Sequence, residues 1–194
     1  ITCRDWSSDV CSSDLDNSFW FDGKVDEVAI YARNLDAAQV AAHYANGIDP
    51  APATAYNPLV LAEQPLGYWR LNEPALPPLP TAVNVGSLGA VADGSYINGA
   101  YGGQLGAIAG DSDTAAGFDG ANDKIDVPHN AELNSAETFT VACWAKVVGG
   151  SDHRSPLSSR DDPAPVGTDP RGYIFYATPG DTWEFWTGDG EGPS

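Results

Sequence analysis

Residues 19–47 read FWFDGKVDEVAIYARNLDAAQVAAHYANG, and this stretch decides the predicted fold. It contains VDEVAIY, residues 25–31, in which apolar side chains fall on both faces of a predicted strand. Regular alternation separates two sets of residues: Val25, Glu27, Ala29 and Tyr31 on one face, and Asp26, Val28 and Ile30 on the other. A strand that is apolar on both faces suits the interior of a two-layer β-sandwich.

The second half of the same stretch predicts a short helix. Asp36 and Gln39 have the spacing of a capping box, in which each side chain accepts a hydrogen bond from the other residue's backbone amide. Gly47 suits the C-terminal end of this helix. Because the helix is short, it must dock on the preceding strand to be stable.

The rest of the chain predicts strands. Ala115–Pro128 has the pattern of a hairpin whose second strand is Lys124–Val127. Phe139–Val148, FTVACWAKVV, is apolar at every second residue and is the strongest strand pattern in the chain. Two later strands, Tyr173–Tyr176 and Thr182–Trp186, are joined by a Thr-Pro-Gly-Asp turn. The predicted fold class is therefore all-β with one short helix.

The composition limits the classes of partner. The 194-residue chain has 27 Asp and Glu against 9 Lys and Arg, and a formal net charge of −18. Such a surface repels phosphate backbones, so nucleic acid is not an expected partner. The acidity indicates an extracellular or salt-adapted surface, and dedicated cation binding is the alternative. No apolar run is long enough to predict a membrane span.

The first residues fit nothing downstream. Residues 5–15, DWSSDVCSSDL, resemble the translation of a short-read sequencing adapter over eleven consecutive positions. We therefore predict that residues 1–15 are a non-native segment and not part of either module. Cys3 and Cys11 fall in this segment, which leaves Cys143 in an apolar strand and no disulfide framework.

Four blocks of the sequence carry a family resemblance: LGYWRLNE (66–73), FDGANDKIDVP (118–128), FTVACWAK (139–146) and GKVDEVAIYARNLDAAQVAAHY (23–44). Together they resemble the LamG-like domains of the concanavalin A-like lectin/glucanase superfamily, as found in bacterial surface proteins. The resemblance implies a two-sheet antiparallel jelly-roll sandwich. The block that resembles the end of the domain comes first in this chain.

That order implies a particular domain organisation. Residues 16–48 resemble the last strand and helix of a preceding module, 49–58 a linker, and 59–194 a truncated second module. The family pairs its first and last strands, so we expect Val25–Tyr31 to dock beside Tyr68–Leu71 and complete the sandwich in a circularly permuted way. Neighbouring modules of a longer protein are then expected partners.

The acidic residues do not predict catalysis. Glycosidases of the resembled superfamily need two carboxylates on alternate positions of one strand, and retaining enzymes hold them about 5 Å apart. Asp26 and Glu27 are adjacent, and Glu184 stands alone between tryptophans. The sequence thus predicts a protein that is not an enzyme.

Aromatic residues are the candidate ligand-binding groups. Tyr173, Tyr176, Trp183 and Trp186 lie on two late predicted strands, and aromatic faces stack on the C–H faces of sugar rings. The alternative is that these side chains fill the sandwich core.

The resemblance also implies a calcium ion near the start and end of the sandwich. Asp26 and Glu73 match the expected positions for its ligands, provided the permuted pairing forms. The alternative is two ordinary solvated acids.

The combined expectation is a non-catalytic, secreted or cell-surface module that binds carbohydrate or an extracellular protein. Two alternatives stay open. The chain could be an accessory domain of a glycoside hydrolase, or a structural spacer in a repetitive adhesin.

Overall fold

The computed structural model describes residues 2–3, 19–75, 81–134, 137–159 and 171–189. The adapter-like residues 5–15 lie outside these ranges. The strands are β1 (Thr2–Cys3), β2 (Asp22–Tyr31), β3 (Gly67–Trp69), β4 (Ser95–Ile97), β5 (Tyr101–Leu105), β6 (Thr114–Asp119), β7 (Lys124–Val127), β8 (Thr140–Val147), β9 (Arg171–Ala177) and β10 (Trp183–Asp189). The helices are α1 (Ala37–Ile48) and α2 (Tyr56–Ala62), with 3-10 turns at Gly89–Ala92 and Ala131–Asn134. The predicted all-β class is confirmed, and every strand pair except β1–β7 is antiparallel.

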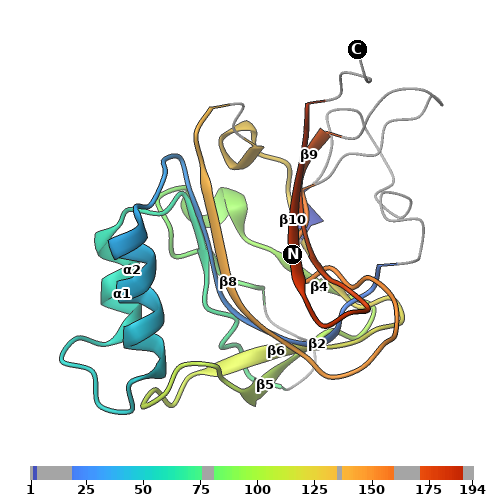
Figure 1. Cartoon of the computed structure of the whole chain (residues 1–194), viewed down its shortest axis with the longest axis horizontal. Helices are drawn as coiled ribbons and strands as arrows, with labels where there is room; N and C mark the ends of the chain where they lie inside the picture. Colours follow the sequence, from blue (N-terminus) through green and yellow to red (C-terminus); the bar gives the residue numbers. More distant parts are fainter. Residues whose placement is uncertain (1, 4–18, 76–80, 135–136, 160–170, 190–194) are drawn as a thin grey trace.

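β2 is the central strand of the larger sheet (Figure 1). β8 pairs along one side of β2. On the other side β6 pairs with the first half of β2 and β3 with the second half. β5 extends the sheet beyond β6. This one ribbon therefore holds together strands from three distant parts of the chain.

The predicted pairing of residues 25–31 with the 66–73 region is confirmed. Val28 lies opposite Trp69, and Ile30 lies opposite Gly67, in an antiparallel register. β2 is nevertheless an interior strand, because β8 covers its other side.

The predicted alternation along β2 is wrong at one point. A β-bulge interrupts the β2–β8 register between Asp26 and Ala29, where Glu27 has a left-handed backbone with φ of 49°. A bulge inserts one residue and reverses the side on which later side chains point. Val25 consequently shares the main core with Val28 and Ile30 instead of lying on the face of Ala29 and Tyr31.

The remaining strands face this sheet. β4–β7–β1 form a three-stranded sheet and β9–β10 a two-stranded one. The main core joins both groups and includes fully buried Trp69, Leu71, Ile125 and Val127. Phe139, just before β8, and alternate residues of β8 pack against this core as the sequence pattern predicts: Val141, Cys143, Ala145 and Val147.

The hairpin predicted for residues 115–128 does not form. β6 pairs with β2 and β5, whereas β7 pairs with β4 and β1, so the two strands belong to different sheets. The turn between them is closed by Asp123, whose carboxylate accepts the Asp119 amide at 3.0 Å. A connection between two sheets has the same short, polar sequence as a hairpin turn, and the strand pattern alone does not separate them.

α1 has the predicted capping box. The Gln39 amide donates to Asp36 Oδ1 at 2.8 Å, and the Asp36 amide donates to Gln39 Oε1 at 2.9 Å. Gly47 lies in the last turn of the helix, where a Cβ would overlap the Trp144 ring of β8. The glycine thus permits close packing of the helix on the sheet. It does not end the helix as predicted, because α1 continues through Ile48 and its C-cap is Asp49.

α2 is a second helix, and it begins inside residues 49–58, which the sequence predicts as a linker. Pro58 argues against a helix in the sequence, but proline is tolerated in the first turn of a helix. Tyr56 and Val60 are one turn apart and buried, and they join Tyr31 and Tyr68 in a smaller core between the helices and the sheet. Neither described helix has the length and apolarity needed to cross a membrane.

Candidate binding surface

The β9–β10 hairpin carries all four aromatic residues predicted to bind a ligand. Its turn is fixed by Arg154, which donates to the carbonyls of Thr178 at 3.0 Å and of Gly149 and Gly150 at 2.7 Å. The turn also contains Thr178 and Thr182, whose hydroxyls are 2.7 Å apart. β10 is exposed along its described length. The hairpin turn is thus held by side-chain hydrogen bonds, and the strand that follows it is open to solvent.

The pairing register divides the four aromatics into two pairs. Trp183 lies opposite Ala177 and Trp186 opposite Ile174. Because directly opposite residues share a face, Trp183 lies on the face of Tyr173, and Trp186 on the face of Tyr176. The four side chains therefore do not form one platform.

Burial divides them again. Tyr173 and Tyr176 are only 3% and 6% exposed, whereas Trp183 is 51% and Trp186 59% exposed. The core-filling alternative thus describes the two tyrosines. The two tryptophans are accessible to a ligand, one on each face of β10.

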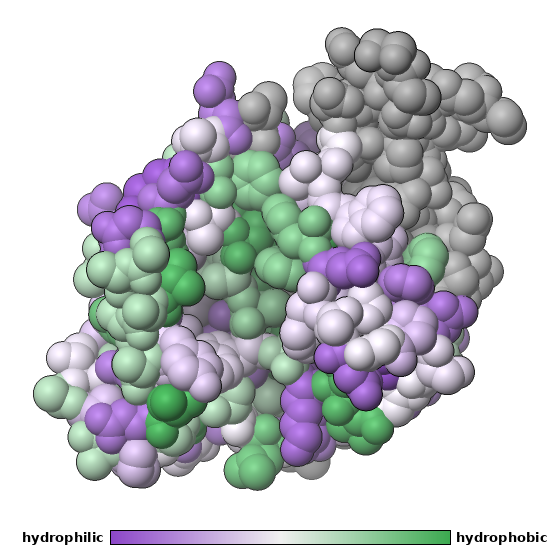
Figure 2. All heavy atoms as spheres, in the orientation of Figure 1, coloured by the Kyte–Doolittle hydropathy of each residue, from purple (hydrophilic) through white to green (hydrophobic). Residues whose placement is uncertain are grey.

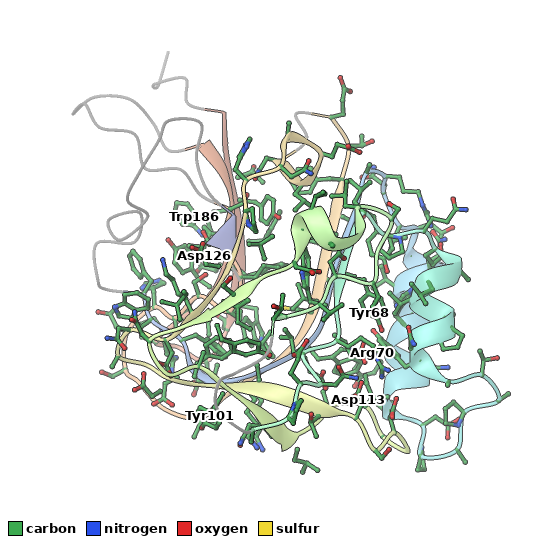
Figure 3. The ribbon with its side chains drawn as sticks, turned by 180° about the vertical axis from the view of Figure 1, so that it is seen from behind. Tyr68, Arg70, Tyr101, Asp113, Asp126 and Trp186 are labelled. Carbon is green, nitrogen blue, oxygen red and sulfur yellow. The ribbon has the colours of Figure 1, made fainter. Side chains whose placement is uncertain are left out.

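Trp186 is held in a defined orientation (Figure 3). Its indole Nε1 donates to Glu184 Oε2 at 2.9 Å. The Tyr176 ring meets the indole edge-on, with centroids 6.4 Å apart and an interplanar angle of 87°. Tyr176 is packed in turn by Phe19 and His153, at 5.2 and 5.4 Å. The result is an exposed, oriented indole beside an exposed carboxylate.

The opposite face of β10 turns toward β8. Phe185 contacts Phe175 with ring centroids 4.8 Å apart, and Phe139 lies 6.4 Å from Phe185. Figure 2 shows apolar side chains in the hollow between β8 and the hairpin. Trp183 lies on this apolar face.

A buried group of charged residues forms a second feature on the far side of the molecule, where β2 meets β3 and the segment 106–113 (Figure 3). Asp26 is 2% exposed, and its Oδ2 accepts the Ala107 amide at 2.7 Å. Its Oδ1 accepts no hydrogen bond from the residues that the structure describes. Burial, and then the neighbouring Glu27 and Asp113 carboxylates, raise the pKa of Asp26 to about 7.

Arg70 supplies the positive charge of this group. Its guanidinium lies 3.1 Å from Glu27, 3.2 Å from Asp111, and in a close ion pair with Asp113. Glu27 also accepts a short hydrogen bond from the Tyr68 hydroxyl, and burial raises the pKa of Glu27. Sequence reasoning missed this network. The signal was two adjacent acids inside an apolar strand.

The predicted calcium ligands have separate partners. Glu73 Oε1 accepts the Val83 amide at 3.0 Å, and Oε2 accepts the Tyr96 hydroxyl at 2.7 Å, whereas Asp26 binds Ala107. Among the described residues, no group of three or more His, Cys, Asp or Glu side chains is arranged to hold a metal ion. Calcium binding stays a prediction that a calcium-dependent rise in the unfolding midpoint would support.

Comparison with known protein families, with curated proteins and with solved structures finds no match to this chain.

Proposed function

We propose that the chain is a non-catalytic, LamG-like jelly-roll module that binds carbohydrate through Trp186. The observation that carries the proposal is the geometry of this side chain, 59% exposed yet oriented by Glu184 and Tyr176. An indole that is already oriented loses little conformational freedom when a ligand stacks on it.

The chemistry of the site suits a sugar ring. A pyranose presents C–H groups on its face and hydroxyls at its rim. The indole face can stack on the former, and the Glu184 carboxylate beside it can accept hydrogen bonds from the latter. Glu184 has no second carboxylate opposite it, because its cross-strand neighbour is Tyr176. This pairing supports binding without hydrolysis as part of the proposal.

A protein ligand is the second candidate, favoured by the apolar face of the same strand. Trp183 and Phe185 are 51% and 46% exposed there. Exposed apolar patches of this kind are typical of protein contacts. The two candidates use opposite faces of β10, so single substitutions separate them.

The expected setting is a secreted or cell-surface protein in which this module has neighbouring modules. A role as an accessory domain of a glycoside hydrolase uses the same sugar-binding face. A role as a spacer needs no exposed, oriented tryptophan, and Trp186 therefore favours binding.

Substitution of Trp186 tests the proposal. We expect Trp186→Ala to weaken binding of glycans selected on an oligosaccharide array by tenfold or more, roughly 1.4 kcal/mol, because the stacking surface is lost. Isothermal titration with the selected glycan measures the effect.

Trp183→Ala is the matched control, because it removes the same side chain from the other face of β10. It is expected to bind the glycan within about twofold of the unchanged protein, as a face that does not contact the ligand should. Equal losses in both variants, or no glycan binding by the unchanged protein, would refute carbohydrate binding at Trp186.

A further inference from the structure

Resting on the proposed carbohydrate binding, we infer that the Trp186 site selects neutral sugars and sugars with a protonated amino group over acidic sugars, and that Glu184 sets this preference. The first observation is the hydrogen bond of 2.9 Å that fixes the Glu184 carboxylate to the indole. A ligand stacked on Trp186 must therefore lie within a few ångströms of a carboxylate.

The basic residues that the structure describes near the site already have partners. From Gly172 to the end of the chain the sequence has four acids and no Lys, Arg or His. Arg154 is buried and donates to the backbone carbonyls of Gly149, Gly150 and Thr178. His153 lies 3.5 Å from the Asp152 carboxylate. An anionic sugar would face Glu184 without a partner among these groups.

A sugar with a protonated amine would be attracted by the Glu184 carboxylate, which repels an acidic sugar. An ammonium group donates a charge-assisted hydrogen bond to a carboxylate, which is stronger than a neutral one. For two unit charges about 4 Å apart in water the energy corresponds to about a fivefold change in affinity. The chain's net charge of −18 acts in the same direction over longer distances.

The test compares three β-1,4-linked oligosaccharides of equal length that differ in charge: glucosamine, N-acetylglucosamine and glucuronate. All three oligosaccharides are titrated under the same conditions, at about pH 6. In low salt we expect the glucosamine oligosaccharide to bind about fivefold more tightly than the neutral one, and the glucuronate one about fivefold more weakly. High salt should compress the differences.

Two substitutions attribute the preference to Glu184. Glu184→Gln keeps an oxygen that can accept the indole hydrogen bond and removes the charge, so it should bring the three affinities to within about twofold of one another. Asp181→Asn removes one charge from the exposed turn, where φ is 56° and asparagine is well tolerated. This control should keep the preference.

The outcomes separate the two proposals. If Trp186→Ala weakens binding but all three sugars bind the unchanged protein alike, or the glucuronate binds best, the charge selection is refuted and carbohydrate binding stands. Selection that persists in Glu184→Gln also refutes the role of Glu184. If none of the three sugars binds and array glycans also fail, the proposed function itself is refuted.

Discussion

Asp26→Asn is expected to stabilise the protein above pH 7 and to remove most of the fall in stability between pH 4 and pH 7. Burial raises the pKa of Asp26 to about 7 in the folded protein, against about 3.9 for an unfolded chain. Below pH 4 both states hold the proton. Between pH 4 and 7 the unfolded state releases it first, so the free energy of unfolding decreases as the pH rises.

The size of the effect follows from this difference. Three pH units at about 1.4 kcal/mol each give a fall of up to about 4 kcal/mol, complete above pH 7. Asparagine can still accept the Ala107 amide hydrogen bond and has no proton to lose. The acids that remain beside it, Glu27 and Asp113, are paired with Arg70. Glu27, whose pKa is also raised, is expected to leave a residual slope of the same sign.

Urea unfolding at several pH values between 4 and 8 measures the profile. Asp181→Asn, at an exposed turn, serves as the control and should follow the unchanged protein. Parallel profiles for Asp26→Asn and the unchanged protein would show that Asp26 is ionised in the folded state at neutral pH.

Trp69→Ala is expected to lower the free energy of unfolding by about 3–5 kcal/mol, because it deletes a fully buried side chain from the main core. The indole Nε1 also donates to the Ala92 carbonyl at 2.9 Å, and the substitution leaves that carbonyl without its donor. Trp69 lies opposite Val28 in the β2–β3 pairing. The decrease in the free energy of unfolding therefore measures how much the packing of β3 against β2 stabilises the fold.

Denaturant unfolding at about pH 5, where Asp26 is protonated, measures the change. Trp183→Ala makes the same substitution at a site that is 51% exposed, and should change stability by no more than about 0.5 kcal/mol. A loss at Trp69 no larger than at Trp183 would mean that β3 is not packed against β2 in solution.

The sequence predicted elements whose signals are local. The capping box of α1, the core-facing residues of β8 and the β9–β10 hairpin needed only short-range patterns. The β2–β3 pairing came from the family resemblance. Glu27 could not be foreseen as a bulge, because nothing in its chemistry favours a positive φ and the strain is compensated by tertiary contacts with Tyr68 and Arg70. The buried charge network was hidden for the same reason.

The sequence spacing alone shows that the four aromatic residues lie on two faces of the hairpin. Trp183 and Trp186 differ by three positions, as do Tyr173 and Tyr176, and residues an odd number apart in a regular strand point to opposite faces. Spacing thus excludes a single four-residue platform. The burial of Tyr173 and Tyr176 could not be predicted from the sequence, because it depends on contacts with Phe139 and Phe19, which are distant along the chain.

The central position of β2 has a kinetic consequence. Its partners begin at residues 67, 114 and 140, so the ladder closes only when segments far along the chain have been synthesised and brought together. Topologies dominated by such distant contacts fold in milliseconds to seconds, more slowly than locally connected ones. β2 is synthesised before the strands that pair with it. Until they are present, the backbone amides and carbonyls along both of its edges have no strand partner. This apolar strand is therefore the segment most prone to aggregation during folding.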